Sequence, residues 1–400
     1  MKLNLNSFLY SITTAIDAVE KEILNTTTNH SKRVAYIALS LAEELRFTDE
    51  EKFDLCAYAI MHDNGVIQSY RESTSKDNFQ EAETINRHCI IGEQNVKDFP
   101  FYTDNKNIIM YHHETYNGRG YFSKKGEDIP LMSQLIFLAD CIDTHFNLEE
   151  IDLSKKTDVE KFIMNGKDTL FSPRIVALFL NLSDKDIFWY NLEFNMSDVL
   201  EEILPTFIID ISYEQMLTIS KVFSNIVDAK SEFTAKHTCE LMDKAKIMAN
   251  YYELSSEDSY KLQIAANLHD LGKLGTPNDI LEKPSSLTKD EIFIIKKHAS
   301  LTYNILNNIE GMEEIKDIAA AHHERLDGSG YPFGLDSSKL VFEQRLLASL
   351  DIYQALVEDR PYRKSLSHTN AIDILDRLAQ SEGLDKDIVR SIDKVFSNYL

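Results

Sequence analysis

The chain is short of the residues that interrupt helices. Its 400 residues contain 13 glycines and 8 prolines, and both numbers are low for a chain of this length. It also lacks any apolar stretch long enough to cross a membrane, and no basic segment followed by a long apolar core stands near its start. We therefore expect neither secretion nor a membrane-spanning helix.

Cysteine is scarce and dispersed. The four cysteines form no Cys-x-x-Cys pair, and each lies in an apolar, helix-like setting. Thiols spaced in this way predict buried side chains outside disulfides and a reducing, cytoplasmic environment. They are Cys56, Cys89, Cys141 and Cys239.

Basic residues are outnumbered by acidic ones. The 42 lysines and arginines stand against 65 aspartates and glutamates, which gives a formal net charge of −23. Polymeric nucleic acid and anionic membranes need a basic surface, so we expect neither as a partner. A small nucleotide remains compatible, because a few local Lys or Arg side chains and metal ions can bind it. The hydrophobic content of 43% is ordinary for a soluble protein with a sizeable core.

What the sequence does contain is a helical pattern. Apolar residues recur at steps of three and four after His30 and again after His237, as on the buried face of an amphipathic helix. No run of strand length alternates convincingly between apolar and polar residues. The pattern predicts an all-α fold. The recurring residues are Val34, Ile37, Leu41 and Leu45 in the first series and Leu241, Ala245, Met248 and Tyr252 in the second.

The most informative stretch is residues 267–273, Asn-Leu-His-Asp-Leu-Gly-Lys. His269 and Asp270 place an imidazole beside a carboxylate, a mixture that suits iron, manganese or zinc better than calcium. Gly272 lets the backbone turn sharply and approach a ligand. Lys273 offers a positive charge of the kind that binds phosphate. A His-Asp pair alone is common, so the interpretation depends on further ligand-type residues elsewhere.

Such residues occur as two sets in the same order. Ten of the 12 histidines belong to the two sets, and corresponding members lie 207 to 211 residues apart, as His30 and His237 do at one extreme and Asp140 and Asp351 at the other. Identical order with a small drift in spacing is typical of a tandem duplication with loop insertions. The first set is His30, His62, Asp63, His88, His112, His113 and Asp140, and the second is His237, His269, Asp270, His298, His322, His323 and Asp351.

Residues 322–332 read His-His-Glu-Arg-Leu-Asp-Gly-Ser-Gly-Tyr-Pro, downstream of His-Asp-Leu-Gly-Lys at 269–273. Together these motifs closely resemble the HD-GYP phosphodiesterases, a branch of the HD metal-dependent phosphohydrolases. Asp-Arg-Pro-Tyr-Arg at 359–363 is also similar to that family. The resemblance covers roughly residues 220–400.

The resemblance implies two tandem HD-type helical-bundle domains. We predict a degenerate HD-type domain over residues 1–182 and an HD-GYP phosphodiesterase domain over residues 211–400. Residues 183–210 are too apolar for a flexible linker, so we predict a packed helical connector there. Whether the chain forms a homodimer stays open.

The resemblance to the family implies that the second set of ligand-type residues binds two divalent transition metals. Iron or manganese is expected. His237, His269, Asp270 and Asp351 would hold one metal, and Asp270, His298, His322 and His323 the other. Asp270, as the bridge, and Lys273, on the scissile phosphate, are the expected catalytic residues. The expected substrate contacts are Lys273, Asp327, Gly328, Gly330, Tyr331, Pro332, Arg360 and Arg363.

Some family members hold a third metal through a Glu four residues before the first His. Phe233 stands at that position, and Glu232 is one place off, so we expect two metals.

The first half departs from the family around its ligands. Val66 stands where the second half has Lys273, Phe122 replaces the motif proline, and Asn117 replaces the motif aspartate. All seven ligand-type residues nevertheless remain, which predicts a further metal site without phosphodiester binding. We expect this half to be regulatory or structural.

The leading functional hypothesis is a phosphodiesterase that hydrolyses cyclic di-GMP to pGpG or GMP through two-metal activation of a bridging water. One alternative is hydrolysis of another cyclic dinucleotide, such as cyclic GMP-AMP. The other is a non-catalytic nucleotide sensor or scaffold that binds metal. The sequence does not discriminate between the cyclic dinucleotides.

Overall fold

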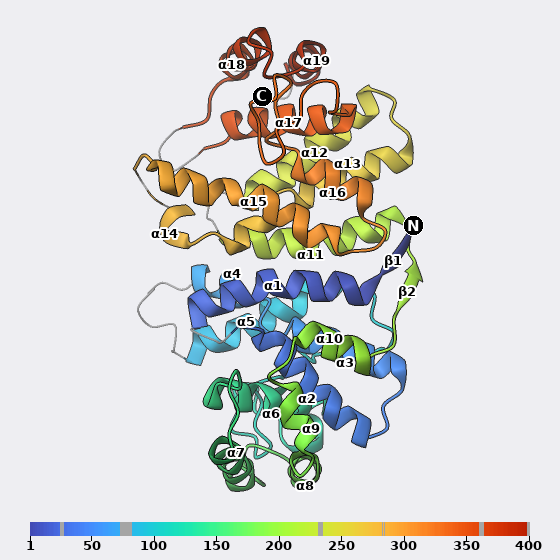
Figure 1. Cartoon of the computed structure of the whole chain (residues 1–400), viewed down its shortest axis with the longest axis vertical. Helices are drawn as coiled ribbons and strands as arrows, with labels where there is room; N and C mark the ends of the chain where they lie inside the picture. Colours follow the sequence, from blue (N-terminus) through green and yellow to red (C-terminus); the bar gives the residue numbers. More distant parts are fainter. Residues whose placement is uncertain are drawn as a thin grey trace. The chain divides into compact units, whose positions relative to one another are not determined.

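The computed structural model describes residues 1–24, 28–72, 82–230, 235–281, 283, 285–359 and 364–397. Regular structure in these ranges is almost entirely helical, which confirms the predicted all-α class (Figure 1). Within the same ranges the only strands are β1 (Lys2–Asn4) and β2 (Ile208–Asp210), which pair antiparallel. No helix among the described residues has the length and apolar character that a bilayer crossing requires.

The chain folds into two compact units. The N-terminal unit is Leu5–Phe207, and the C-terminal unit combines Met1–Asn4 with Ile208–Leu400. The first four residues therefore belong with the second half of the chain. The boundaries that we predict at residues 182 and 210 stay predictions.

In its described ranges the N-terminal unit is mostly helical, and its longest described non-helical segment lies between α5 and α6. Its elements are α1 (Leu5–Leu24), α2 (His30–Glu44), α3 (Asp49–Ile60), α4 (Val66–Glu72), α5 (Ala82–Asn95), η1 (Gly126–Asp128), α6 (Leu131–Phe146), α7 (Leu153–Asn165), α8 (Pro173–Ser183), α9 (Asp186–Asn191) and α10 (Met196–Ile203).

The C-terminal unit repeats much of this order. Besides β1 and β2, its elements are α11 (Tyr213–Lys230), α12 (Ala235–Tyr251), α13 (Ser256–Leu268), η2 (Leu271–Gly275), α14 (Asn278–Leu281), α15 (Lys289–Asn307), α16 (Glu313–Ala320), α17 (Phe342–Val357), α18 (His368–Gln380) and α19 (Lys386–Phe396).

One central helix organises each unit. Helix α2 packs against α3 and α6, and α12 packs against α13 and α17. Both central helices carry the first histidine of their set, His30 in α2 and His237 in α12. Six of the eight apolar residues that recur at helical spacing after each histidine are buried, Leu41 and Leu241 among them, and Leu45 and Tyr252 are half-buried. The core therefore lies around the same helices that carry the candidate ligands.

Capping fixes where several of the surrounding helices begin. Thr48 accepts a hydrogen bond from the backbone N–H of Glu51, and the Glu51 carboxylate accepts one from the N–H of Thr48. Thr288 and Glu291 form the same reciprocal pair at the start of α15. Each capping box satisfies two N–H groups that a helix end leaves without partners.

Helices α9 and α10 lie in the region predicted as a packed connector. Both belong to the N-terminal unit, where α10 packs against α2. Phe188 and Trp189 are buried, and the Phe188 ring stacks on Tyr36 with centroids 5.7 Å apart. These aromatic residues thus contribute to the core of the N-terminal unit.

A glycine allows a close backbone approach at the same place in both units. A Cβ atom added to Gly272 in η2 would lie 2.0 Å from the carbonyl oxygen of His298, and one added to Gly65 would lie 2.3 Å from that of His88. Thr302 strengthens the contact in the C-terminal unit, because its Oγ1 accepts from the N–H of Gly272 and donates to the carbonyl of His269. Only glycine at this position brings the His-Asp turn against the helix that carries the third histidine.

We predict that Gly272→Ala lowers the stability of the C-terminal unit. The added methyl group meets backbone, so the helix must shift, and such overpacking costs about 1–3 kcal/mol. Thermal unfolding measures the loss. Gly275→Ala is the matched control, because its nearest neighbour is the Cδ1 end of the flexible Leu301 side chain at 3.0 Å. Equal melting temperatures for the two variants would contradict the assignment.

Candidate metal centres

The C-terminal unit brings all seven predicted ligands of its set together. Among them the structure holds three groups whose ligand atoms lie within 4.8 Å of one another. The groups are His237 with His269 and Asp351, His269 with Asp270 and His322, and His298 with His322 and His323. Six of these side chains are buried, and His323 is partly exposed.

Three of the histidines are oriented by the backbone in the same way. The Nδ1 atoms of His269, His298 and His322 each lie 2.7 Å from the carbonyl oxygen three residues earlier. A carbonyl only accepts, so each Nδ1 carries the proton and donates it. Each Nε2 atom of the neutral ring is therefore left with a lone pair, as a metal ligand requires.

Two of these Nε2 atoms face each other. His298 Nε2 lies 3.2 Å from His322 Nε2, a distance at which two lone pairs repel. The buried Asp270 Oδ1 lies 3.5 Å from the first and 3.9 Å from the second, and it has no hydrogen-bond partner among the described residues. A cation among these three atoms would satisfy all of them, so the donor set fits a metal.

His237 is held by a carboxylate that the sequence motifs do not include. Its Nδ1 lies 3.0 Å from both carboxylate oxygens of Glu358, and its Nε2 lies 3.1 Å from Asp351 Oδ1. Burial alone would lower the pKa of His237, but these contacts with Asp351 and Glu358 raise it to about 9. Glu358 follows Asp351 by seven residues, two helical turns, and that spacing is the signal that would have identified it.

Lys273 lies against the proposed bridging aspartate. Its Nζ is 2.5 Å from Asp270 Oδ2. Burial would raise the pKa of Asp270, but His269 and Lys273 outweigh it and hold that pKa well below its usual value. Asp270 is therefore an ionised acceptor, and the lysine charge lies within reach of any anion that approaches the centre.

The loop at residues 327–335 contacts this centre through Tyr331. The Tyr331 ring packs against His323 with centroids 4.7 Å apart, and the peptide bond from Tyr331 to Pro332 is cis. Asp327, by contrast, is exposed and accepts hydrogen bonds from Ser329 within the loop. Gly328 adopts a positive φ of 74°, which suits the turn.

The buried Glu324 holds this loop in place. Its carboxylate accepts from the backbone N–H groups of Phe333 at 2.7 Å and Leu335 at 2.9 Å. Glu114 does the same in the N-terminal unit, where it accepts from Phe122 and Lys124. Only glycine at position 330 lets the loop come this close to the Glu324 backbone, since an added Cβ would lie 2.4 Å from Glu324 Cα.

Four sequence predictions fall on residues outside the described ranges. They concern Arg360, Arg363, Phe233 and Glu232.

The N-terminal unit also brings its seven ligand-type residues together. His62 and His112 donate from Nδ1 to the carbonyl oxygen three residues earlier, at 2.8 and 2.6 Å. His30 instead contacts a carboxylate that the motifs do not include, because its Nδ1 lies 2.7 Å from Asp143 Oδ2. Arg33 holds the other oxygen of Asp143 at 2.5 Å. Val66, at the position of Lys273, is buried.

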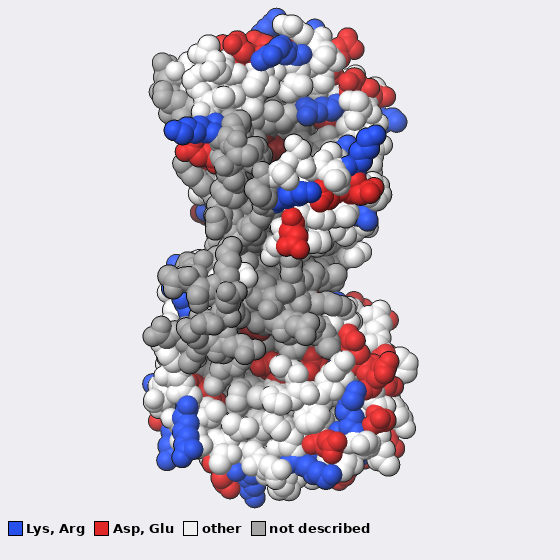
Figure 2. Space-filling model, turned by 90° about the vertical axis from the view of Figure 1, so that its left-hand side faces the viewer, with Lys and Arg blue, Asp and Glu red and all other residues white. Residues whose placement is uncertain are grey.

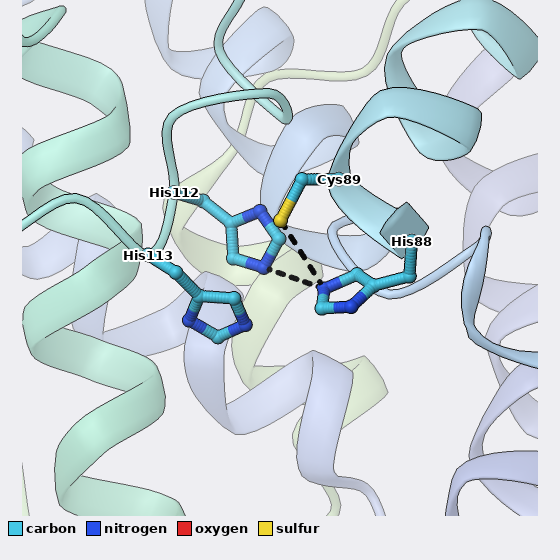
Figure 3. Close-up of side chains that lie close together, drawn as sticks. All are labelled: His88, Cys89, His112 and His113. Carbon is cyan, nitrogen blue, oxygen red and sulfur yellow. Dashed lines mark hydrogen bonds between the residues drawn. The ribbon is translucent and has the colours of Figure 1, made fainter. Parts of the chain in front are cut away.

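A cysteine joins the N-terminal cluster. The ligand atoms of His88, Cys89, His112 and His113 all lie within 4.8 Å of one another (Figure 3). Cys89 Sγ is 3.5 Å from His88 Nε2, which is 3.4 Å from His112 Nε2. Burial would raise the pKa of Cys89, but His112 and His88 outweigh it and lower the pKa to about 6. The sequence predicted Cys89 only as a buried thiol, because a single cysteine on a helix has no pattern that marks it as a ligand.

We predict that Glu358→Gln weakens metal binding in the C-terminal unit by about 10–100-fold, the usual effect of losing an outer carboxylate behind a ligating histidine. Removing the charge leaves His237 less basic and less firmly oriented. Competition between the metal-free protein and a chelating dye for Mn²⁺ measures the affinity. Glu343→Gln, in the first turn of α17, is the control, and an unchanged affinity in Glu358→Gln would argue against this role.

Comparison with known proteins identifies both halves of the chain as HD domains. HD-domain models match residues 221–388 and residues 27–145. A 3'3'-cGAMP-specific phosphodiesterase of Vibrio cholerae is 29% identical over 96% of this chain and 90% of its own length. A second from that organism is 31% identical over 74% of this chain and 64% of its own. A cyclic di-GMP phosphodiesterase response regulator of Xanthomonas campestris is 32% identical over 42% of this chain and 44% of its own.

A solved structure shares the fold along the whole chain. The crystal structure of a cyclic GMP-AMP-specific phosphodiesterase of Vibrio cholerae superposes with a TM-score of 0.68 at 23% identity, and it covers 100% of this chain and 99% of that one. The two matched domains, the paired clusters and these similarities lead to one assignment. The chain belongs to the HD superfamily of phosphohydrolases and carries two HD domains in tandem.

Proposed function

We propose that the chain is a metal-dependent phosphodiesterase of cyclic dinucleotides, that the C-terminal unit carries out hydrolysis, and that 3'3'-cyclic GMP-AMP is preferred over cyclic di-GMP. The observation that carries the proposal is the C-terminal cluster, where lone pairs of His298 and His322 face each other. Beside them lies Asp270 Oδ1, which has no hydrogen-bond partner in the part of the chain that the structure describes.

The substrate preference rests on the extent of the similarities. The two cGAMP-specific relatives match 96% and 74% of this chain, whereas the cyclic di-GMP phosphodiesterase of Xanthomonas campestris matches 42%. This supports the alternative that the sequence analysis left open over its leading hypothesis of cyclic di-GMP.

In this mechanism each residue has one task. His237, His269 and Asp351 would hold one metal, and His298, His322 and His323 the other, with Asp270 between them. When bound, two divalent cations lower the pKa of water and neutralise charge on a phosphodiester. The histidines on backbone carbonyls keep their Nε2 atoms directed inward, so the donors need no rearrangement.

Individual lysine side chains supply positive charge close to the C-terminal centre. Lys273 is placed to contact a phosphate oxygen beside Asp270, and Lys296 lies 4.7 Å above the Tyr331 ring. On the face drawn in Figure 2 the described lysines and arginines are interspersed with acidic side chains. Such a surface favours a small anionic ligand over a polymer, and the absence of a nucleic-acid partner stays a prediction.

The metals in the C-terminal unit are proposed to be iron or manganese. The donor set there consists of imidazoles and carboxylates without sulfur, which these metals accept readily. The N-terminal unit is proposed to support or regulate its neighbour, since Val66, Phe122 and Asn117 replace residues expected to bind the phosphodiester.

We predict that the purified protein hydrolyses 3'3'-cyclic GMP-AMP with a kcat/KM at least about tenfold above that for cyclic di-GMP, which corresponds to one hydrogen bond gained or lost at a base. Chromatography of products after timed incubation measures both rates. A higher rate with cyclic di-GMP would overturn the preference, and no hydrolysis of either would overturn the activity.

We predict that the double variant His269→Ala and Asp270→Ala loses hydrolysis together with its bound iron or manganese, because a ligand of one metal and the aspartate between the two metals both disappear. The corresponding pair in the other unit, His62→Ala and Asp63→Ala, leaves hydrolysis detectable. Turnover and elemental analysis on the same samples give both readouts. Full turnover in the first variant, or only magnesium in the wild-type protein, would contradict the assignment.

A further inference from the structure

The two centres differ at one position beside their third histidine. Cys89 follows His88 in the N-terminal unit, and Ala299 follows His298 in the C-terminal unit. Both side chains are fully buried. The alanine methyl cannot bind a metal, so the C-terminal centre has no donor at this position. The sulfur of Cys89 instead points among the imidazoles of His88 and His112 (Figure 3).

Two of the separations among these atoms match those of a four-coordinate zinc site. Zinc binds imidazole nitrogen at about 2.0–2.1 Å and thiolate sulfur at about 2.3 Å in tetrahedral geometry. These lengths place two nitrogens about 3.3–3.4 Å apart and a nitrogen and a sulfur about 3.6 Å apart. The observed separations are 3.4 Å for His88 Nε2 to His112 Nε2 and 3.5 Å for Cys89 Sγ to His88 Nε2.

We propose that His88, Cys89, His112 and His113 form a closed zinc site, distinct in metal and in role from the C-terminal centre. His113 supplies the fourth donor, since its ring nitrogen lies within 4.8 Å of the other three ligand atoms. A thiolate with imidazoles selects zinc over the harder iron and manganese ions. Four protein donors leave no position for water or phosphate, which is typical of structural zinc.

The orientation of the rings supports this site. His112 donates from Nδ1 to the carbonyl of Ile109 at 2.6 Å, so its Nε2 faces His88 as an acceptor. The buried Asp63 Oδ1 lies 3.1 Å from His88 Nε2 and offers a negative charge beside the metal. Closure by Cys89 also accounts for the retention of ligand-type residues in a unit that has Val66 in place of the phosphate-binding lysine.

The test uses the full chain, freed of metal and reloaded with Zn²⁺ or with Co²⁺ as a spectroscopic probe. X-ray absorption on the zinc form is expected to show a sulfur neighbour at about 2.3 Å. The cobalt form is expected to show a sulfur-to-cobalt charge-transfer band in the near ultraviolet. Neither readout involves hydrolysis, so failure of this proposal is distinguishable from failure of the proposed activity.

Cys89→Ala, which installs the residue of the C-terminal unit, is expected to abolish the band and to weaken zinc binding by more than about 100-fold, beyond the effect of an outer hydrogen-bond partner. Cys56→Ala removes another buried thiol of the same unit and is expected to keep the band. If Cys89→Ala does not fold, Cys89→Ser provides the same test with a side chain of nearly equal size. A band that persists without Cys89, or a zinc form with nitrogen and oxygen neighbours alone, overturns the proposal.

Discussion

The metal centres depend on one hydrogen bond used repeatedly, from an imidazole Nδ1 to the carbonyl oxygen three residues earlier. Five of the clustered histidines make it, among them His269, His298 and His322 in the C-terminal unit. The bond fixes both the tautomer and the direction of the ring, so Nε2 faces the centre of the bundle before any metal arrives. This arrangement places the Nε2 lone pairs of His298 and His322 3.2 Å apart in a buried site, where they repel each other. A bound cation would offset this repulsion. The helices therefore form a site whose donor atoms are already arranged to bind a positive ion.

The two units keep the same scaffold constraints and differ in chemistry. Gly65 and Gly272 allow the same close approach to the backbone of a ligand helix. Glu114 and Glu324 hold the same loop through backbone N–H groups. These residues shape the bundle, and exchanging them would disturb the ligand positions. Other positions beside the two centres differ, with Val66 in place of Lys273 and Cys89 in place of Ala299. These differences underlie the proposal that the N-terminal unit supports or regulates the C-terminal unit on the same type of fold.

Much of this could be predicted from the sequence, because helical periodicity and the repeated order of histidines are local and discrete signals. The all-α class followed from the periodicity and the tandem repeat from the order of the histidines, whereas the HD assignment came from the resemblance of residues 269–273 and 322–332 to that family. Glu358, Asp143 and Cys89 were missed, since their roles depend on which side chains the packing brings together. The strand pair was missed as well, because three residues are too few to show an alternating pattern. Substrate preference was left open for a related reason, since base recognition depends on loop positions that no motif encodes.

The strand pair has a consequence for the order in which the chain is built. Leu3 in β1 is fully buried, and its partner Ile209 lies more than 200 residues later. An added Cβ on Gly311 would meet the carbonyl of Lys2 at 2.0 Å, so the C-terminal unit fits closely around the start of the chain. In topological terms, the N-terminal unit is an insertion between two strands of the other one. During translation, β1 is therefore synthesised long before β2 and the rest of the C-terminal unit. It has no partner strand until the inserted N-terminal unit has been synthesised.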